Sequence, residues 1–170
     1  MIAINIILNK EMAKTMKIGI VIHSKTGNTL SVAQKAKQEL LKAGHSVTVE
    51  QVTSVDEEAA AQGKVQLKNI PDVSSYDAVI FGAPVHAFSL SQVMKEYLSK
   101  TPSLSDKKVS CFVTQQFPYA WMGGNRAVGQ MRKACEAKGT SVLVAGIVNW
   151  SHKQRETRIS DMVKKLTVNL

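Results

Sequence analysis

Cysteine and aromatic residues are scarce in this sequence. Aromatic side chains make up 5 % of its 170 residues, and only two residues, Cys111 and Cys135, are cysteines. The two cysteines lack the spacing of metal ligands, so no metal site is expected. Cys111 lies in a predicted strand and Cys135 in a predicted helix, and both are expected to be small core residues in a reducing compartment, which implies a cytoplasmic protein.

Long apolar runs are also missing. None approaches the roughly 20 residues that a bilayer-spanning helix requires, so we expect no membrane span. With 44 % hydrophobic and 21 % charged residues, the composition is that of one soluble globular domain. Residues 1–15 fall outside the pattern that follows them and lack the features of a signal peptide. We expect an N-terminal extension there, either disordered or translated from an upstream start codon, before a domain at residues 16–170.

Acidic residues are in the minority. Lysine and arginine number 22 against 13 aspartates and glutamates, which gives a formal charge of +9. Such a field attracts anions, nucleic acids and membrane surfaces without specificity. Long runs of like charge do not occur, and aromatic residues are not interleaved with basic ones, so we expect no specific nucleic-acid partner.

The first apolar strand pattern ends in a loop that is rich in hydroxyl groups. Residues 18–22 are apolar and mostly β-branched, and residues 24–29 read Ser-Lys-Thr-Gly-Asn-Thr before a helical pattern that stops at Gly44. Such a loop presents backbone N–H groups at a helix N-terminus, and Lys25 adds a positive charge. A phosphate monoester is the ligand that it suits best.

Two other phosphate-binding loops do not fit. The nucleoside-triphosphatase loop requires Gly-Lys-Ser/Thr, but Gly27 is followed by Asn28. The dinucleotide fingerprint requires three glycines, and this turn has one.

Five strand patterns alternate with helical ones. They lie at residues 17–22, 46–52, 78–83, 109–114 and 141–148. Residues 53–75 show only a short or irregular crossover, and Asn125 is expected to cap the helix that ends at Gly139. The alternation predicts an α/β fold in three layers, with a parallel sheet between helices on both faces.

In an open sheet of this kind with the order 2-1-3-4-5, ligands bind at the carboxyl ends of the strands, between the first and third. The loops at that point are residues 24–29 and 84–89, with residues 115–124 beside them. These three loops therefore form the expected site.

Residues 24–29, 76–85 and 123–125 together resemble the flavodoxin superfamily, and the similarity covers residues 17–168. The resemblance implies a flavodoxin-like sandwich with a five-stranded parallel sheet. It also implies noncovalently bound FMN, with the phosphate in the first loop and the isoalloxazine ring held by the other two.

By position, the resemblance assigns cofactor contacts in all three loops. The phosphate would be bound by Ser24, Lys25, Thr26, Gly27, Asn28 and Thr29. The ring would be bound by Pro84, Val85, His86, Ala87, Phe88, Gln115, Gln116, Phe117, Pro118, Tyr119, Trp121 and Gly123.

The chemistry of these loops agrees with that assignment. An isoalloxazine needs a flat apolar slot, and a stacked aromatic ring contributes roughly 0.5–1.5 kcal/mol beyond its burial. Phe117, Tyr119 and Trp121 lie in one loop of a chain with few aromatic residues. His86 is either a neutral loop histidine bonded to backbone or a proton donor, and no catalytic residue is assigned.

Two departures from the family pattern argue against a pure one-electron carrier. Many electron-carrying flavodoxins are strongly acidic, whereas this chain is basic. Ala87 stands where a glycine often permits the peptide flip that stabilises one-electron-reduced flavin, and alanine is expected to resist positive φ.

The leading interpretation is an FMN-binding flavodoxin-like protein, a monomer or dimer, that serves electron transfer or redox chemistry. Its partner would be a redox protein or a small-molecule electron acceptor. One alternative is an NAD(P)H-dependent quinone or flavin reductase on the same fold, which would make the chain an FMN-dependent oxidoreductase. The other is an interaction domain that binds no flavin.

Overall fold

The computed structural model describes residues 14–170. The expected N-terminal extension lies outside the described residues except for its last two positions, so it stays a prediction.

A parallel sheet forms the middle layer of the molecule. Its strands are β1 (Lys17–Ile22), β2 (Ser46–Gln51), β3 (Ala78–His86), β5 (Lys108–Gln115) and β6 (Val142–Asn149). They lie in the order β2-β1-β3-β5-β6, which is the expected order once a sixth strand is set aside. That strand, β4 (Ser89–Leu90), pairs antiparallel with the end of β3.

The burial of each strand follows its place in the sheet. The first six residues of β3 are all buried, because β1 and β5 flank the strand and helices cover both of its faces. In β2, at the edge, most residues are exposed or half-buried and Val47 alone is buried. The alternating sequence of this strand correctly predicted an edge.

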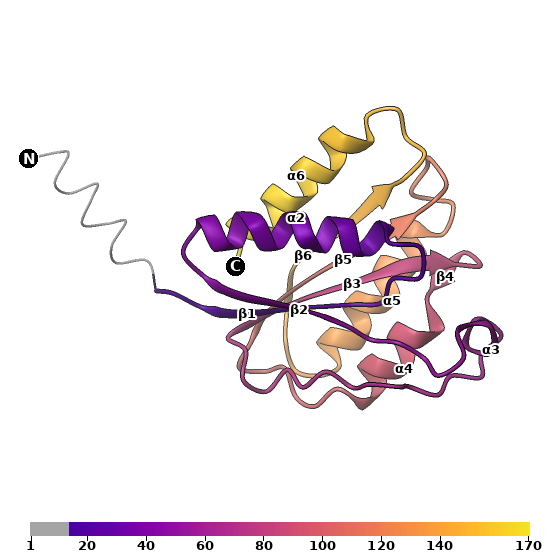
Figure 1. Cartoon of the computed structure of the whole chain (residues 1–170), viewed down its shortest axis with the longest axis horizontal. Coiled ribbons are helices and arrows are strands. Elements are labelled where there is room, and N and C mark those ends of the chain that lie inside the picture. The colour runs from indigo at the N-terminus through magenta and orange to yellow at the C-terminus, as the bar shows by residue number, and fades with distance from the viewer. Residues whose placement is uncertain (1–13) are drawn as a thin grey trace, which may run out of the picture.

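Helices cover both faces of the sheet (Figure 1). On one face lie α2 (Asn28–Lys42) and α6 (Arg155–Val168). On the other lie α3 (Glu57–Ala61), α4 (Gln92–Lys100) and α5 (Gly124–Glu136). In the part of the chain that the structure describes, no helix has both the length and the apolar character needed to cross a bilayer.

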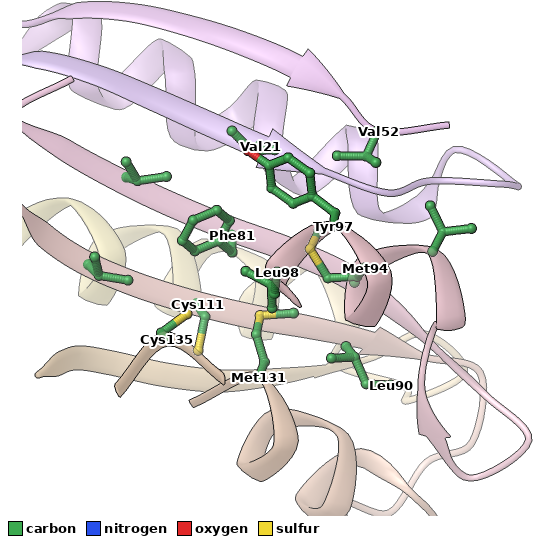
Figure 2. Packing of buried hydrophobic residues seen from close by; sticks show 14 of the residues in the cluster. Val21, Val52, Phe81, Leu90, Met94, Tyr97, Leu98, Cys111, Met131 and Cys135 are labelled. Atoms are coloured by element: carbon green, nitrogen blue, oxygen red, sulfur yellow. The ribbon is translucent and has the colours of Figure 1, made fainter. Parts of the chain in front are cut away.

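Each face of the sheet has its own buried apolar cluster. Figure 2 shows the cluster under α4 and α5, where Phe81 from β3 packs near Tyr97. Cys111 and Cys135 are buried free thiols in this cluster, as the sequence predicted. Burial raises the pKa of the Cys111 thiol to about 12, so this thiol is inert at neutral pH.

Two local expectations were wrong. Residues 84–86 continue β3 instead of forming a loop, because β4 folds back and pairs Val85 with Leu90. Asn125 does not cap α5; the capping position is Gly123, with φ 107° and no side-chain hydrogen bond to the helix. A left-handed backbone at that position favours glycine over any capping side chain.

Candidate functional site

The loop between β1 and α2 presents unpaired backbone donors. Gly27 precedes the helix with φ 92°, and no side chain caps the helix end. Within residues 14–170, the N–H groups of residues 25–29 have no protein acceptor. These donors lie at the positive end of a 15-residue helix, which makes the loop suitable for an anion.

The side chains of this loop have different roles. The Ser24 hydroxyl accepts a hydrogen bond from the Leu30 N–H, and the exposed Thr26 hydroxyl has no partner within the described chain. The hydroxyls of Thr29 and Thr114 are buried and bond to each other at 2.8 Å. The Lys25 ammonium pairs with the Glu58 carboxylate at 2.6 Å, so its charge is partly neutralised.

A cavity of about 180 Å³ opens beside this loop at the carboxyl ends of β1, β3 and β5. All three loops expected from the sequence contribute to it. Its walls are formed by Ser24, Lys25, Thr26, Asn28, Thr29, Pro84, Val85, His86, Thr114, Gln115 and Gln116. Thr114 was missed because it is a strand residue, not a loop residue.

The remaining residues assigned from the sequence do not form the walls of this cavity. They are Gly27, Ala87, Phe88, Phe117, Pro118, Tyr119, Trp121 and Gly123. Four of them are exposed aromatic side chains that lie in two parallel pairs. Phe88 and Phe117 have ring centroids 5.8 Å apart, and Tyr119 and Trp121 have centroids 6.2 Å apart.

A tight hairpin between β3 and β4 carries Phe88. Ala87 has φ 47° and Phe88 has φ 60°, so both central residues are left-handed, as in a type I′ turn. The expectation that Ala87 resists positive φ was therefore wrong. A left-handed conformation costs a non-glycine residue roughly 1–2 kcal/mol, and this strain is held by the pairing of the flanking strand residues.

Two sets of contacts hold the loop after β5 in place, one with the hairpin and one within the loop itself. A Cβ atom on Gly123 would lie 2.7 Å from the Phe88 Cα, so only glycine permits this approach. The buried Gln115 amide donates to the carbonyls of Phe117 and Tyr119 at 3.3 and 2.6 Å. Gln115 therefore shapes the backbone of the aromatic loop.

His86 lies at the end of β3, half-buried. Its ring meets the ring of His23 edge-on, with centroids 5.9 Å apart. Within the described residues its ring nitrogens have no hydrogen-bond partner, so the backbone-bonded alternative expected from the sequence is not seen. Burial lowers the pKa of His86, and the nearby His23 and Lys25 lower it further.

His23 is the centre of a buried hydrogen-bonded chain. It follows β1 and is 2 % exposed. Its Nδ1 lies 3.0 Å from the Ser91 hydroxyl, and its Nε2 lies 3.0 Å from the Glu57 carboxylate. Burial lowers the pKa of His23, although Glu57 opposes that effect. This cluster could not be predicted from the sequence, because its members come from three distant segments.

Comparison with known proteins identifies the fold and the family. The family model described as flavodoxin matches residues 20–160. The chain belongs to the flavodoxin family. No curated protein sequence matches it.

Solved structures show the same flavodoxin fold. Oxidised flavodoxin 2 from Bacillus cereus has a TM-score of 0.67 and 19 % identity, and the match covers 91 % of this chain and 99 % of that one. Two-electron-reduced flavodoxin from Megasphaera elsdenii has a TM-score of 0.63 and 19 % identity, with coverages of 89 % and 98 %. A Lactobacillus acidophilus flavoprotein solved with FMN has a TM-score of 0.58 and 17 % identity, with coverages of 87 % and 99 %.

Family membership confirms the expectations of FMN as the cofactor and of electron transfer as the role, and it implies redox partners. The residues of this flavodoxin fit FMN. The open N–H groups of the first loop suit its phosphate, and the exposed aromatic pairs suit a flat ring. At about 180 Å³, the cavity suits the phosphate and the polar chain, since pockets for whole cofactors span roughly 300–1,000 Å³. A bound ring would have to lie outside this cavity, at the rim formed by the exposed aromatic pairs.

Proposed function

We propose that this flavodoxin binds one FMN per chain at the site formed by its three loops. The observation that carries the proposal is the set of unpaired N–H groups at residues 25–29, which open into a cavity with hydroxyl-bearing walls. These donors and the Thr26 hydroxyl would bind the phosphate. The hairpin of β3 and β4 and the loop at residues 116–123 would hold the ring.

When bound, FMN supplies a ring that accepts and releases electrons. The chain binds and orients it. Gln115 holds the aromatic loop in place, and Gly123 lets that loop meet the hairpin. Phe88 and Phe117 would border the ring and limit its contact with water.

The hairpin favours two-electron chemistry with a small-molecule acceptor, such as a quinone or flavin, over a pure one-electron carrier. Reversing the central peptide of its type I′ turn would produce a type II′ turn. That turn requires glycine at its first central position, which is Ala87 here. The flip that stabilises one-electron-reduced FMN is therefore opposed by a side chain.

We further propose that residues 16–170 form the flavodoxin domain and that the protein is cytoplasmic. The domain is supported by a continuous sheet that begins at Lys17 and by a last helix that ends at Val168. The two buried free thiols support a reducing compartment.

Isothermal titration with FMN tests the proposed function. We expect one FMN per chain with a dissociation constant at or below micromolar, and flavin absorption that stays with the protein through gel filtration. Riboflavin, which lacks the phosphate, should bind much more weakly. Absence of FMN binding at micromolar concentrations would refute the proposal.

A further inference from the structure

His86 is placed where a proton could be exchanged with the cofactor site. Its ring forms part of the wall of the cavity beside the first loop, and it is the only histidine among the residues that line that cavity. It also lines a second, much smaller cavity of about 10 Å³, whose walls include His23 and Glu57. Histidine is the side chain whose charge changes most readily near neutral pH.

The other polar groups of the cofactor cavity are poor candidates for this exchange. Its hydroxyls and amides do not titrate near neutrality. The Lys25 ammonium is paired with Glu58, and that hydrogen bond raises the pKa of Lys25 further above neutrality. His86 is therefore the group on the cavity wall that can change its charge there.

Glu57 supplies a compensating negative charge at the small cavity that His86 also lines. Its carboxylate lines the small cavity together with His86 and Gln92, and the volume is roughly that of one water molecule. Burial alone would raise the pKa of Glu57, but hydrogen bonds from the Ser54 N–H and from His23 leave it lowered. Glu57 is thus ionised at neutral pH, and its side chain, 30 % exposed, reaches solvent.

The proton on His23 can be assigned from its partners. The ionised Glu57 carboxylate only accepts hydrogen bonds, so neutral His23 carries its proton on Nε2 and donates to it. Its Nδ1 then accepts from the Ser91 hydroxyl, whose oxygen in turn accepts from the Met94 N–H. Both ring nitrogens of His23 are engaged, which fixes the ring against which His86 packs.

We propose that His86 takes up a proton from solvent when negative charge enters the cofactor site, and that Glu57 and His23 position it for this. The inference rests on the proposed FMN site. The electrons come from an external redox partner, the proton comes from solvent on the Glu57 side, and His86 holds it on a ring nitrogen. His86 thereby couples electron transfer to proton uptake.

The charged and titratable groups that face His86 set the direction of the effect. His23 and Lys25 disfavour its protonated form, and Glu57 favours it. A bound phosphate adds negative charge beside the ring and should raise the pKa of His86. A rise of one unit corresponds to a tenfold tighter binding of FMN at low pH than at high pH.

The first measurement is an imidazole NMR titration of the protein with and without FMN. We expect His23 to keep its proton on Nε2 and the pKa of His86 to rise when oxidised FMN binds. In Glu57→Gln the pKa of His86 should be lower than in the wild type in both forms. The matched control is His45→Gln, because His45 accepts a bond from the Met16 N–H near the start of β1 and is absent from the walls of both cavities.

The second measurement is the midpoint potential of bound FMN as a function of pH. In the wild type the slope should change at the pKa of His86. That change should vanish in His86→Gln, move to lower pH in Glu57→Gln and persist in His45→Gln.

FMN that binds without shifting the pKa of His86, or a slope change that survives in His86→Gln, would overturn this inference while leaving the proposed function intact. Absence of FMN binding would overturn both. His86 is only half-buried, so His86→Gln is expected to fold. Glu57→Gln is measured separately, so a folding defect in one variant leaves the other as a test.

Discussion

The rings of Phe88 and Phe117 lie parallel, with an interplanar angle of 0° and centroids 5.8 Å apart. One ring comes from the hairpin of β3 and β4, and the other comes from the loop after β5, so the two segments expected to hold the isoalloxazine meet each other. Aromatic pairs of this geometry contribute about 0.5–1.5 kcal/mol. A bound isoalloxazine at this rim must replace that contact with stacking of its own.

The phosphate loop can be tested with two threonine variants. Thr26→Val should weaken FMN binding about tenfold or more, because a hydrogen bond to a charged group contributes about 1.5–3 kcal/mol. Thermal stability should not change, since Thr26 is exposed. Thr29→Val should also destabilise the fold by about 1 kcal/mol, because the buried Thr114 hydroxyl loses its partner.

Calorimetric titration with FMN and with riboflavin measures the effect of each variant on ligand binding, and urea unfolding measures its effect on stability. Riboflavin binding should be nearly indifferent to Thr26→Val. Equal losses for the two ligands would show that the phosphate lies elsewhere.

The contact between Gly123 and the hairpin predicts a sharp effect of one methyl group. Gly123→Ala should destabilise the protein by about 2–4 kcal/mol, because it combines a left-handed backbone with an overlap at the Phe88 Cα. Urea unfolding measures this. The matched control is Gly129→Ala in α5, where an added Cβ meets nothing within 4 Å. It should stabilise by roughly 0.5–1 kcal/mol; similar effects of the two changes would contradict the packing.

The buried histidine predicts how stability depends on pH. The pKa of His23 is lowered in the folded state, so below its ordinary value of 6.5 the unfolded chain binds more protons. Stability should be complete above pH 6.5 and fall on acidification, by up to about 1.4 kcal/mol per pH unit for each proton. The pKa of His86 is also lowered in the folded state, so His86 adds to this loss of stability on acidification.

Urea unfolding between pH 5 and 8 checks this. His23→Asn should be less stable at pH 8 but lose less of its stability by pH 5 than the wild type does. A parallel pair of curves would mean that His23 is not buried in its neutral form.

The turn at Ala87 predicts the outcome of reductive titration. Under anaerobic conditions the wild type should accumulate little one-electron-reduced FMN. Ala87→Gly should accumulate more, because glycine removes a penalty of about 1 kcal/mol, roughly fivefold in population, against the flipped peptide. Visible spectra during the titration report this form directly. A large amount of it in the wild type would favour the one-electron carrier.

The sheet and its helices could be predicted because their sequences are locally consistent. Ile18, Ile20 and Ile22 alternate along β1 and face α2 and α6, as a periodicity of two requires. The first loop could be placed because Gly27 and its hydroxyl-bearing neighbours directly follow that strand. These sequence signals depend only on residues that are close to one another in the sequence.

The rest of the site depends on contacts between distant segments. β4 has only two residues, too few to show a period, and exists because β3 extends beyond the sheet to pair with it. Asn125 has the side chain of a cap, but the approach of Phe88 to Gly123 decides where α5 begins. His23 and Ser91 are 68 residues apart in sequence, so nothing local links them.

The crossover that carries Glu57 has a further consequence. Between residues 53 and 75 only Ala60, Pro71 and Val73 are buried apolar residues, and α3 has five residues. A segment with so little buried surface opens at a lower free energy than the sheet, and its amides exchange hydrogen sooner. Such local opening separates Glu57 from His23 while β1 and β3 stay paired. The buried His23 can therefore meet bulk water through a subglobal fluctuation, on a timescale set by α3 and not by global unfolding.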